Sequence, residues 1–246
     1  MKLNVFLNRL DKLSQVIRSR RLLQALIQHR VLAGAEHRNV LTRDLKMVVD
    51  IGANRGQFAL AARRWSPQAR VVSFEPLAGP ADIFCREFEG DNQVVLHRTA
   101  IGPTSMKHQM HISARDDSSS LLPISSAQTA MFPGTGEVAI TEVRVGPLNE
   151  FVVAEDVSAP AILKLDVQGF ELDALRGCES LLHRFAWVYV ECSFAELYEG
   201  QALAHEVIDW LHERGFVLSG VYNISYDREG KAVQADFLFE RSSKGG

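Results

Sequence analysis

The stretch that decides the fold is MVVDIGANRGQF, residues Met47–Phe58. Its β-branched apolar start is typical of a buried strand, its two glycines permit a tight turn, and the apolar residues from Phe58 onward begin a helical pattern. A strand, a glycine-containing turn and a helix in this order form the ligand-site entrance of an open α/β sheet. The sequence therefore predicts a ligand site where this strand ends.

Asp50 stands where a dinucleotide-binding loop has its first glycine, in the pattern Asp-x-Gly-x-x-x-Gly that ends at Gly56. A carboxylate at that position would repel a pyrophosphate, but it would attract a cation such as a sulfonium with an α-ammonium group. An ordinary βα turn with an exposed aspartate is the alternative. No G-x-G-x-x-G follows the strand, which argues against a nicotinamide-dependent oxidoreductase.

Strand and helix patterns alternate along most of the remaining chain. Strands are predicted at 70–74, 93–100, 161–166, 187–191, 216–218 and 235–239, and helices at 81–88, 172–176 and 204–213. This rhythm predicts a parallel, doubly wound sheet that binds ligands at the carboxyl ends of its strands, with the last two strands as an antiparallel pair. Residues 103–147 break the rhythm, and we interpret them as substrate-contacting loops or, alternatively, as a surface excursion.

Residues 1–45 form a separate N-terminal region with a helical pattern. Phe6, Leu10, Leu13 and Ile17 share one face, and the polar face is mostly basic. We expect a helical cap over residues 1–45 and a second domain over residues 46–246. A lid, a homodimer contact or a helix docked on an anionic membrane are the alternatives for the cap.

Composition narrows the function classes. The net charge of −3 gives no reason to expect a nucleic-acid partner, and no run of eighteen apolar residues predicts a membrane span. Cys85, Cys178 and Cys192 form no C-x-x-C pair, which fits free thiols in the cytoplasm. No histidine joins the carboxylates at ligand spacing, so we expect no metal site.

Acidic residues end four of the predicted strands: Asp50, Glu75, Asp166 and Glu191. The carboxyl ends of parallel strands lie on one edge of a sheet, so these carboxylates should gather at the ligand site. Glu75 ends the second strand, where an acid accepts hydrogen bonds from ribose hydroxyls. Together with the Asp50 turn, Glu75 favours a nucleoside-containing cofactor.

Three motifs resemble one known family. They are VDIGANRG at 49–56, SFEP at 73–76 and LKLDVQGFE at 163–171, and QADFLF at 234–239 resembles the same family's last strand. Together they are similar to the FkbM family of S-adenosylmethionine-dependent methyltransferases. The resemblance implies a Rossmann-like class I methyltransferase fold, whose seven-stranded sheet has an antiparallel last strand. It also implies O-methylation, often of sugar or polyketide hydroxyls, with S-adenosyl-L-methionine as the cofactor.

The resemblance also implies a cofactor site, residue by residue. The methionine end and the ribose are expected near the first turn, the ribose hydroxyls at the end of the second strand, the adenine after the third strand, and a further contact in the Ser-Ser-Leu of the following loop. The residues concerned are Asp50, Gly52, Asn54, Gly56, Glu75, Pro76, Ala100, Ile101 and Ser119. Two positions depart from the family's usual residues: Asn149 replaces an acid, and Gln168 stands where Glu is frequent, which argues further against a metal.

Transfer of a methyl group to a hydroxyl is helped by a base. Asp166 is the first candidate, because the fourth strand of this architecture ends beside the methyl group; a carboxylate that only orients the ammonium group is the alternative. Glu171, Glu191 and His111 are weaker candidates, and His37 is expected at the surface. The leading hypothesis is an O-methyltransferase acting on a small hydroxylated metabolite, with a glycosyl unit as the first candidate. The rival is a binding or scaffold protein that keeps the fold without turnover.

Overall fold

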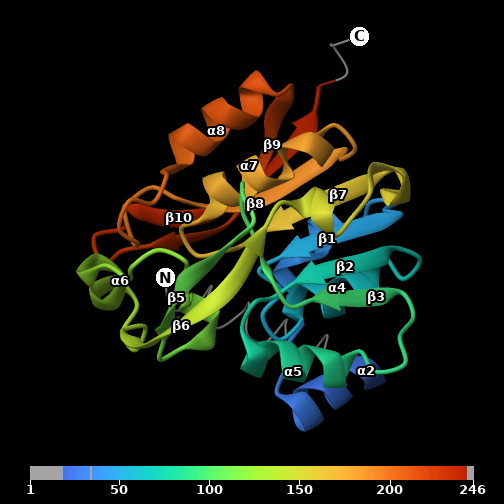
Figure 1. The fold of residues 1–246 in the computed structure, drawn as a ribbon, viewed down its shortest axis with the longest axis horizontal. Coiled ribbons are helices and arrows are strands. Elements are labelled where there is room, and N and C mark those ends of the chain that lie inside the picture. The colour runs from blue at the N-terminus through green and yellow to red at the C-terminus, as the bar shows by residue number, and fades with distance from the viewer. Residues whose placement is uncertain (1–18, 34, 243–246) are drawn as a thin grey trace.

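A computed structural model describes residues 19–33 and 35–242 of the chain (Figure 1). Seven strands form its main sheet in the order β3-β2-β1-β7-β8-β10-β9. Their bounds are β1 Met47–Ile51, β2 Arg70–Phe74, β3 Val94–His97, β7 Ala161–Leu165, β8 Trp187–Ser193, β9 Phe216–Tyr226 and β10 Ala232–Arg241. All neighbours pair in parallel except β10, which is antiparallel to β8 and to β9. The predicted Rossmann-like sheet with an antiparallel last strand is confirmed.

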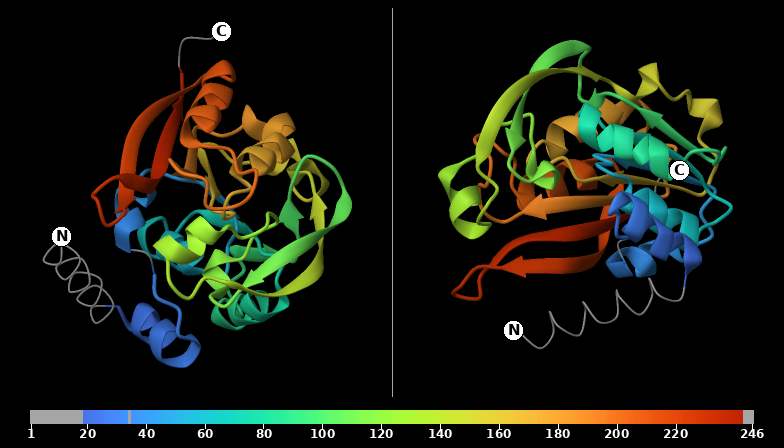
Figure 2. Two further views of the ribbon diagram at one scale, coloured as in Figure 1. Left: turned by 90° about the vertical axis from the view of Figure 1, so that its left-hand side faces the viewer. Right: turned by 90° about the horizontal axis from the view of Figure 1, so that it is seen from below.

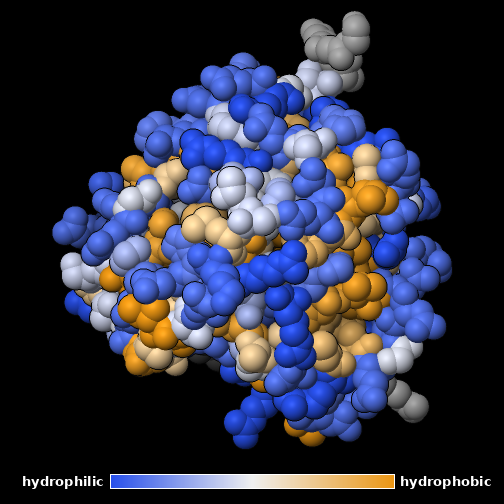
Figure 3. Space-filling view, viewed as in Figure 1, coloured by the Kyte–Doolittle hydropathy of each residue, from blue (hydrophilic) through white to orange (hydrophobic). Residues whose placement is uncertain are grey.

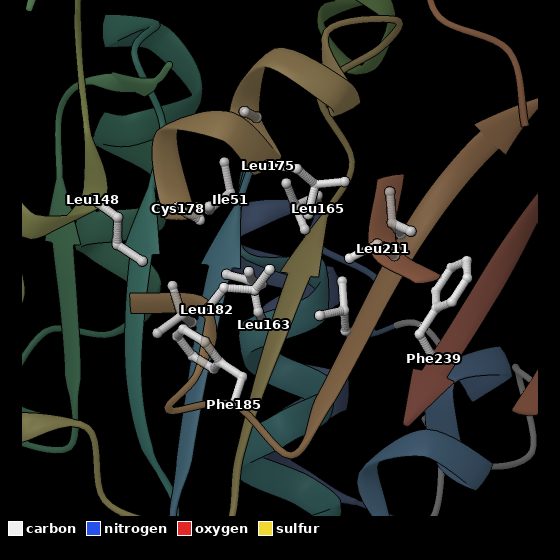
Figure 4. Packing of buried hydrophobic residues seen from close by; sticks show 14 of the residues in the cluster. Ile51, Leu148, Leu163, Leu165, Leu175, Cys178, Leu182, Phe185, Leu211 and Phe239 are labelled. Atoms are coloured by element: carbon white, nitrogen blue, oxygen red, sulfur yellow. The ribbon is translucent and has the colours of Figure 1, made fainter. Parts of the chain in front are cut away.

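Helices cover both faces of the sheet. On one face lie α7 (Glu171–Leu182) and α8 (Ala204–Glu213); on the other lie α4 (Gln57–Trp65) and α5 (Ala78–Glu87). Side chains alternate across each strand, so Val49 packs under α7 whereas Val48 packs under α4. Figure 4 shows Leu175 and Cys178 of α7 close to Ile51 of β1 and Leu165 of β7, in one cluster with Leu163.

Residues 100–146 form a second, smaller sheet in the order β4-β6-β5. Its strands are β4 (Ala100–Ile101), β5 (Met106–Ser113) and β6 (Glu137–Gly146), and α6 (Ser126–Met131) lies in the β5–β6 connection. Figure 2 shows this sheet, in green to yellow, beside the main sheet. The strand predicted over 93–100 is corrected here: β3 ends at His97, and Ala100 already pairs with Val145 of the small sheet.

The described part of the N-terminal region packs against the α4 side of the core. It contains α2 (Arg20–Gln24), a π-helical turn (Ala25–His29), a 3-10 turn (Ala35–His37) and α3 (Arg38–Leu41). Leu22, Val40 and Leu41 are buried there, whereas the predicted apolar face Phe6–Ile17 lies outside the described residues. Within the described ranges, no helix is long and apolar enough to cross a bilayer. Hydrophilic residues cover most of the face in Figure 3, with hydrophobic residues in separate patches, as on most globular domains.

Two positions require glycine, because a Cβ there would overlap the backbone of a neighbouring segment. The helix predicted over 172–176 in fact runs from Glu171 to Leu182 and passes through Gly177. Gly177 lets α7 approach the Gly102 turn, since a Cβ there would lie 2.5 Å from the Gly102 oxygen. Gly52 has φ +78°, and a Cβ there would lie 1.8 Å from the Asp166 carbonyl oxygen. The first turn therefore lies directly against the end of β7.

This contact predicts that Gly52→Ala is far more destabilising than the left-handed backbone conformation of residue 52 alone would explain. Gly90 is the matched control, since it has φ +80° but nothing within 4 Å of its would-be Cβ. Gly90→Ala should lower the free energy of unfolding by about 1–2 kcal/mol, the cost of a left-handed alanine. Gly52→Ala should lower it by at least about 4 kcal/mol, because the Asp166 backbone must also move. Urea denaturation measures both; equal losses would contradict the close approach.

Candidate functional site

A hollow opens where β1, β2 and β7 end, and it encloses about 930 Å³ of space that is partly open to solvent. Its walls come from the first turn, the end of β2, strand β4, the loop after β5, the segment after β7 and the N-terminal region. The lining includes Gly52, Asn54, Glu75, Pro76, Ala100, Ile101, Ser119, Asp166 and His37. The structure thus brings together most of the residues that the sequence predicted for the cofactor site.

Glu75 forms the floor of the hollow and is 5% exposed. Its Oε2 accepts a hydrogen bond from the Asn54 backbone N–H at 2.9 Å, and its Oε1 accepts one from the Leu77 N–H at 2.8 Å. Burial raises the pKa of this carboxyl to about 7, although both backbone bonds oppose the shift. Each oxygen keeps a second lone pair, so Glu75 can still accept hydrogen bonds from two ligand hydroxyls.

Asn54 shapes the first turn from within. It has φ +47°, a left-handed conformation that asparagine tolerates, and its side-chain oxygen accepts the Arg55 N–H at 2.7 Å. The turn therefore holds its own shape and presents the Asn54 N–H to Glu75. Gly56 plays a different part, since it precedes α4 with φ +95°, and a Cβ there would lie 2.6 Å from the Phe88 ring. Gly56 serves the packing of α4 on α5 and does not line the hollow, which corrects its predicted contact with the ligand.

The predicted ligand contact of Asp50 is also corrected. Asp50 lies inside β1 with its side chain toward α4, is 0% exposed, and has its Oδ1 3.0 Å from the Lys164 Nζ. Lys164 sits opposite Asp50 on β7, donates to the Gly52 carbonyl oxygen at 3.0 Å, and lies over the Phe58 ring at 5.6 Å. The Asp50 charge is therefore neutralised within the sheet and does not face a ligand.

A loop of the insertion closes over the first turn. Asp116 accepts a hydrogen bond from the Arg55 Nε at 2.8 Å, and a second guanidinium nitrogen lies 2.6 Å from the same oxygen. Ser119, in the same loop, accepts the Ser113 N–H on its hydroxyl at 3.1 Å. This loop and the small sheet form part of the wall of the hollow, through Met110, Asp116, Asp117, Ser119 and Leu121.

Asp166 lines the hollow directly after β7, and its side chain is 41% exposed. Its Oδ1 accepts a hydrogen bond from the Gln168 amide at 2.7 Å, and the same nitrogen donates to Glu191 Oε2 at 3.0 Å. The Gln168 amide nitrogen thus bridges the two carboxylates, and its side-chain oxygen accepts a hydrogen bond from the Tyr198 hydroxyl at 2.8 Å. The other Asp166 oxygen lies 3.9 Å from the Lys164 Nζ.

The weaker base candidates do not line the hollow. Glu171 is buried under the turn before α7, where its Oε1 accepts the backbone N–H of Val167 and of Gly169, each at 3.1 Å. Burial raises its pKa to about 7. Burial and the nearby Asp166 charge also raise the pKa of Glu191, and His111 pairs with Glu137 at 2.6 Å on the small sheet.

His37 is the functional candidate that the sequence prediction missed. Its ring is half-buried, lines the hollow, and packs edge-on against Phe58 at 5.0 Å and against Tyr189 at 5.6 Å. The expected surface position is corrected. Its neighbours in sequence are polar, so no local pattern could have indicated the contact.

A family model described as a methyltransferase FkbM domain matches residues 50–218, which include β1, β2, β7 and the insertion. The chain belongs to the FkbM methyltransferase family. It is 26% identical over 185 residues to the 2-O-methyltransferase NoeI of Sinorhizobium fredii, covering 70% of this chain and 74% of that protein. It is 27% identical over 151 residues to Methyltransferase 1 of Beauveria bassiana, covering 55% and 59%.

Among solved structures, the precorrin-6y C5,15-methyltransferase of Geobacter metallireducens superposes with a TM-score of 0.47 and 10% sequence identity. The match covers 87% of this chain and 96% of that one.

S-adenosyl-L-methionine is the methyl donor of this family and hence the cofactor of this chain. The residues present fit it. Glu75 retains lone pairs for ribose hydroxyls, Ala100 and Ile101 offer an apolar wall for an adenine, and Asp166 places a carboxylate at the hollow for an ammonium group. In the described part of the chain, no three His, Cys, Asp or Glu side chains are grouped to hold a metal ion.

The buried pair of Lys164 and Asp50 predicts strong coupling between the two residues. Lys164→Met leaves the Asp50 carboxylate without its cation and should cost about 3–5 kcal/mol of unfolding free energy. Asp50→Leu in the Lys164→Met background removes the stranded charge and should recover about 2 kcal/mol or more. Urea denaturation of the wild type, both single variants and the double variant measures the coupling. Additive losses would show that the pair does not act as a unit.

Proposed function

We propose that this methyltransferase transfers the methyl group to a hydroxyl oxygen of a small metabolite, and that the acceptor is a glycosyl unit. The observation that carries the proposal is the division of the hollow into two ends. Glu75 follows β2 on one side of the first turn and, with Ala100 and Ile101, marks an end suited to a nucleoside. Asp166 follows β7 on the other side of that turn and, with His37, marks a polar end. The family relative named as a 2-O-methyltransferase supports oxygen as the acceptor atom.

When it is bound, the donor supplies a sulfonium methyl group that is already activated for transfer. Glu75 would accept the ribose hydroxyls on its free lone pairs and so hold the nucleoside end of the donor at the floor. Asp166 lines the hollow with an exposed carboxylate, which would hold either the acceptor hydroxyl or the donor's ammonium group. The loop held by Arg55 and Asp116 excludes water from the reacting atoms and keeps the acceptor in line.

Methyl transfer from isotope-labelled S-adenosylmethionine to a panel of methyl glycosides tests the proposal. Wild-type protein should give O-methylated product with at least one glycoside. Asp166→Asn should lower either kcat, if Asp166 contacts the hydroxyl, or cofactor affinity, if it holds the ammonium group. Cofactor binding without turnover on every acceptor would favour the scaffold hypothesis, and no binding at millimolar cofactor by folded protein would exclude the proposed activity.

The raised pKa of Glu75 predicts that cofactor binding releases protons near neutral pH. Because the pKa of Glu75 is about 7 in the free protein, more than half of this carboxyl is protonated at pH 6. Ribose hydroxyls donate best to the ionised form, so binding lowers the pKa of Glu75 and releases its proton. Affinity should therefore rise as the pH rises to about 7 and level off above it.

Isothermal titration at pH 6 in buffers of different ionisation enthalpy measures this release. Glu75→Gln should abolish it. Glu171→Gln is the matched control: the pKa of Glu171 is also about 7, but Glu171 lies outside the hollow, so this variant should keep the release. Equal proton release by wild-type protein and Glu75→Gln would rule out Glu75 as the ribose-binding residue.

A further inference from the structure

A chain of hydrogen bonds leads from the polar end of the hollow along the α4 face of the sheet to β10 and β9. The His37 Nδ1 lies 3.1 Å from the Tyr189 hydroxyl oxygen, and that hydroxyl donates to Asp236 Oδ2 at 2.7 Å. The Asn223 amide nitrogen donates to the same Asp236 oxygen at 2.6 Å and to the Tyr189 oxygen at 3.3 Å. Of these four residues, only His37 lines the hollow.

With Asp236 ionised, the hydrogen-bond partners of Tyr189 assign the tautomer of His37. A tyrosine hydroxyl has one proton, and here Tyr189 gives it to the Asp236 carboxylate. His37 Nδ1 must therefore be the donor to the Tyr189 oxygen, which places the proton of the neutral ring on Nδ1. The lone pair of His37 is then on Nε2, the nitrogen that makes no hydrogen bond to the sheet.

The surroundings keep this ring neutral but ready to accept a proton. Burial lowers the pKa of His37, and the Lys164 ammonium acts in the same direction. Three carboxylates oppose them: Asp236, Glu36 and Asp166. Burial also raises the pKa of Tyr189, so its hydroxyl keeps its proton. Tyr189 therefore connects His37 to the Asp236 carboxylate only through hydrogen bonds.

We propose that His37 is the general base of the methyl transfer, with Tyr189 and Asp236 as positioning residues. The inference rests on the proposed function, since it needs a hydroxyl acceptor. As the acceptor oxygen forms its bond to the methyl carbon, its O–H bond breaks and the proton passes to His37 Nε2. The carbon–sulfur bond breaks with its electron pair left on sulfur, and Asp236 stabilises the imidazolium through Tyr189. Asp166 is then left to hold the ammonium group of the donor.

The N-terminal region thereby becomes part of the active site. His37 precedes the residues that match the family model, and Asn223 and Asp236 follow them. The base and the carboxylate at the end of its hydrogen-bond chain therefore lie in segments that flank the matched residues, whereas Tyr189 lies within them. Phe58 and Tyr189 hold the ring from two sides, so its orientation is set before any acceptor binds.

Kinetics on any methyl glycoside that the wild type methylates test the proposal directly. His37→Gln should lower kcat by about 10²- to 10⁴-fold with cofactor affinity unchanged. In the wild type, kcat should fall at low pH as His37 becomes protonated, and this fall should be absent from His37→Gln. Tyr189→Phe should remain active with a kcat below that of the wild type, and its fall of kcat should occur at a different pH. His183→Gln is the control, because His183 is exposed at the end of α7; this variant should match the wild type. A kcat for His37→Gln within threefold of wild type, or a loss of kcat explained by lost cofactor affinity, would overturn the assignment.

Long-range proton–nitrogen NMR of the histidine rings gives a readout that needs no acceptor. At pH 7 and with S-adenosylhomocysteine present, the signals that disappear in His37→Gln should show a protonated Nδ1 and a bare Nε2. In Tyr189→Phe, the population of the other tautomer should rise. A protonated Nε2 in wild-type protein would overturn the proposal. If no glycoside is methylated, the proposed acceptor class fails, and this measurement still supports or refutes His37 as a poised base.

Discussion

The Lys164 ammonium is a buried charge on a central strand, and the groups that neutralise it also position the walls of the site. A cation in the sheet interior is tolerated only when it is paired and hydrogen-bonded. Asp50 supplies the opposite charge and the Gly52 carbonyl supplies an acceptor, so β7 is tied both to β1 and to the turn that follows β1. The same turn presents the Asn54 N–H to Glu75. One ion pair therefore fixes the relative positions of three elements that meet at the hollow.

Helices and strands whose bounds depend on local sequence patterns were predictable. Strand β2 and helix α8 have the predicted bounds, and Glu75 lies at the hollow as its place at the end of a strand implied. The prediction for Asp50 was wrong, because its position in the turn motif suggested a ligand contact. The lysine within the apolar run of β7 was the available signal, since a parallel register puts it opposite Asp50.

His37 and Gly177 lay beyond local reasoning for a different reason. The environment of each is created by residues distant in sequence: Tyr189 and Phe58 around His37, and Gly102 against Gly177. A polar stretch indicates a surface, and a glycine within a helical pattern indicates an end. Tertiary packing overrides both indications here. The same holds for Ala100, which changes sheets because β6 offers it a partner that β2 does not.

Strand β10 comes last in the sheet's chain order, yet it lies between β8 and β9. A chain emerging from the ribosome therefore exposes the pairing edge of β8 until β10 is released, and Tyr189 lacks the Asp236 carboxylate for all of that time. The floor around Glu75 and the Lys164 ion pair that fixes its turn involve residues only as far as β7. Biosynthesis thus completes the donor-binding floor early and the Tyr189–Asp236 anchor late, so a growing chain can form the first without the second.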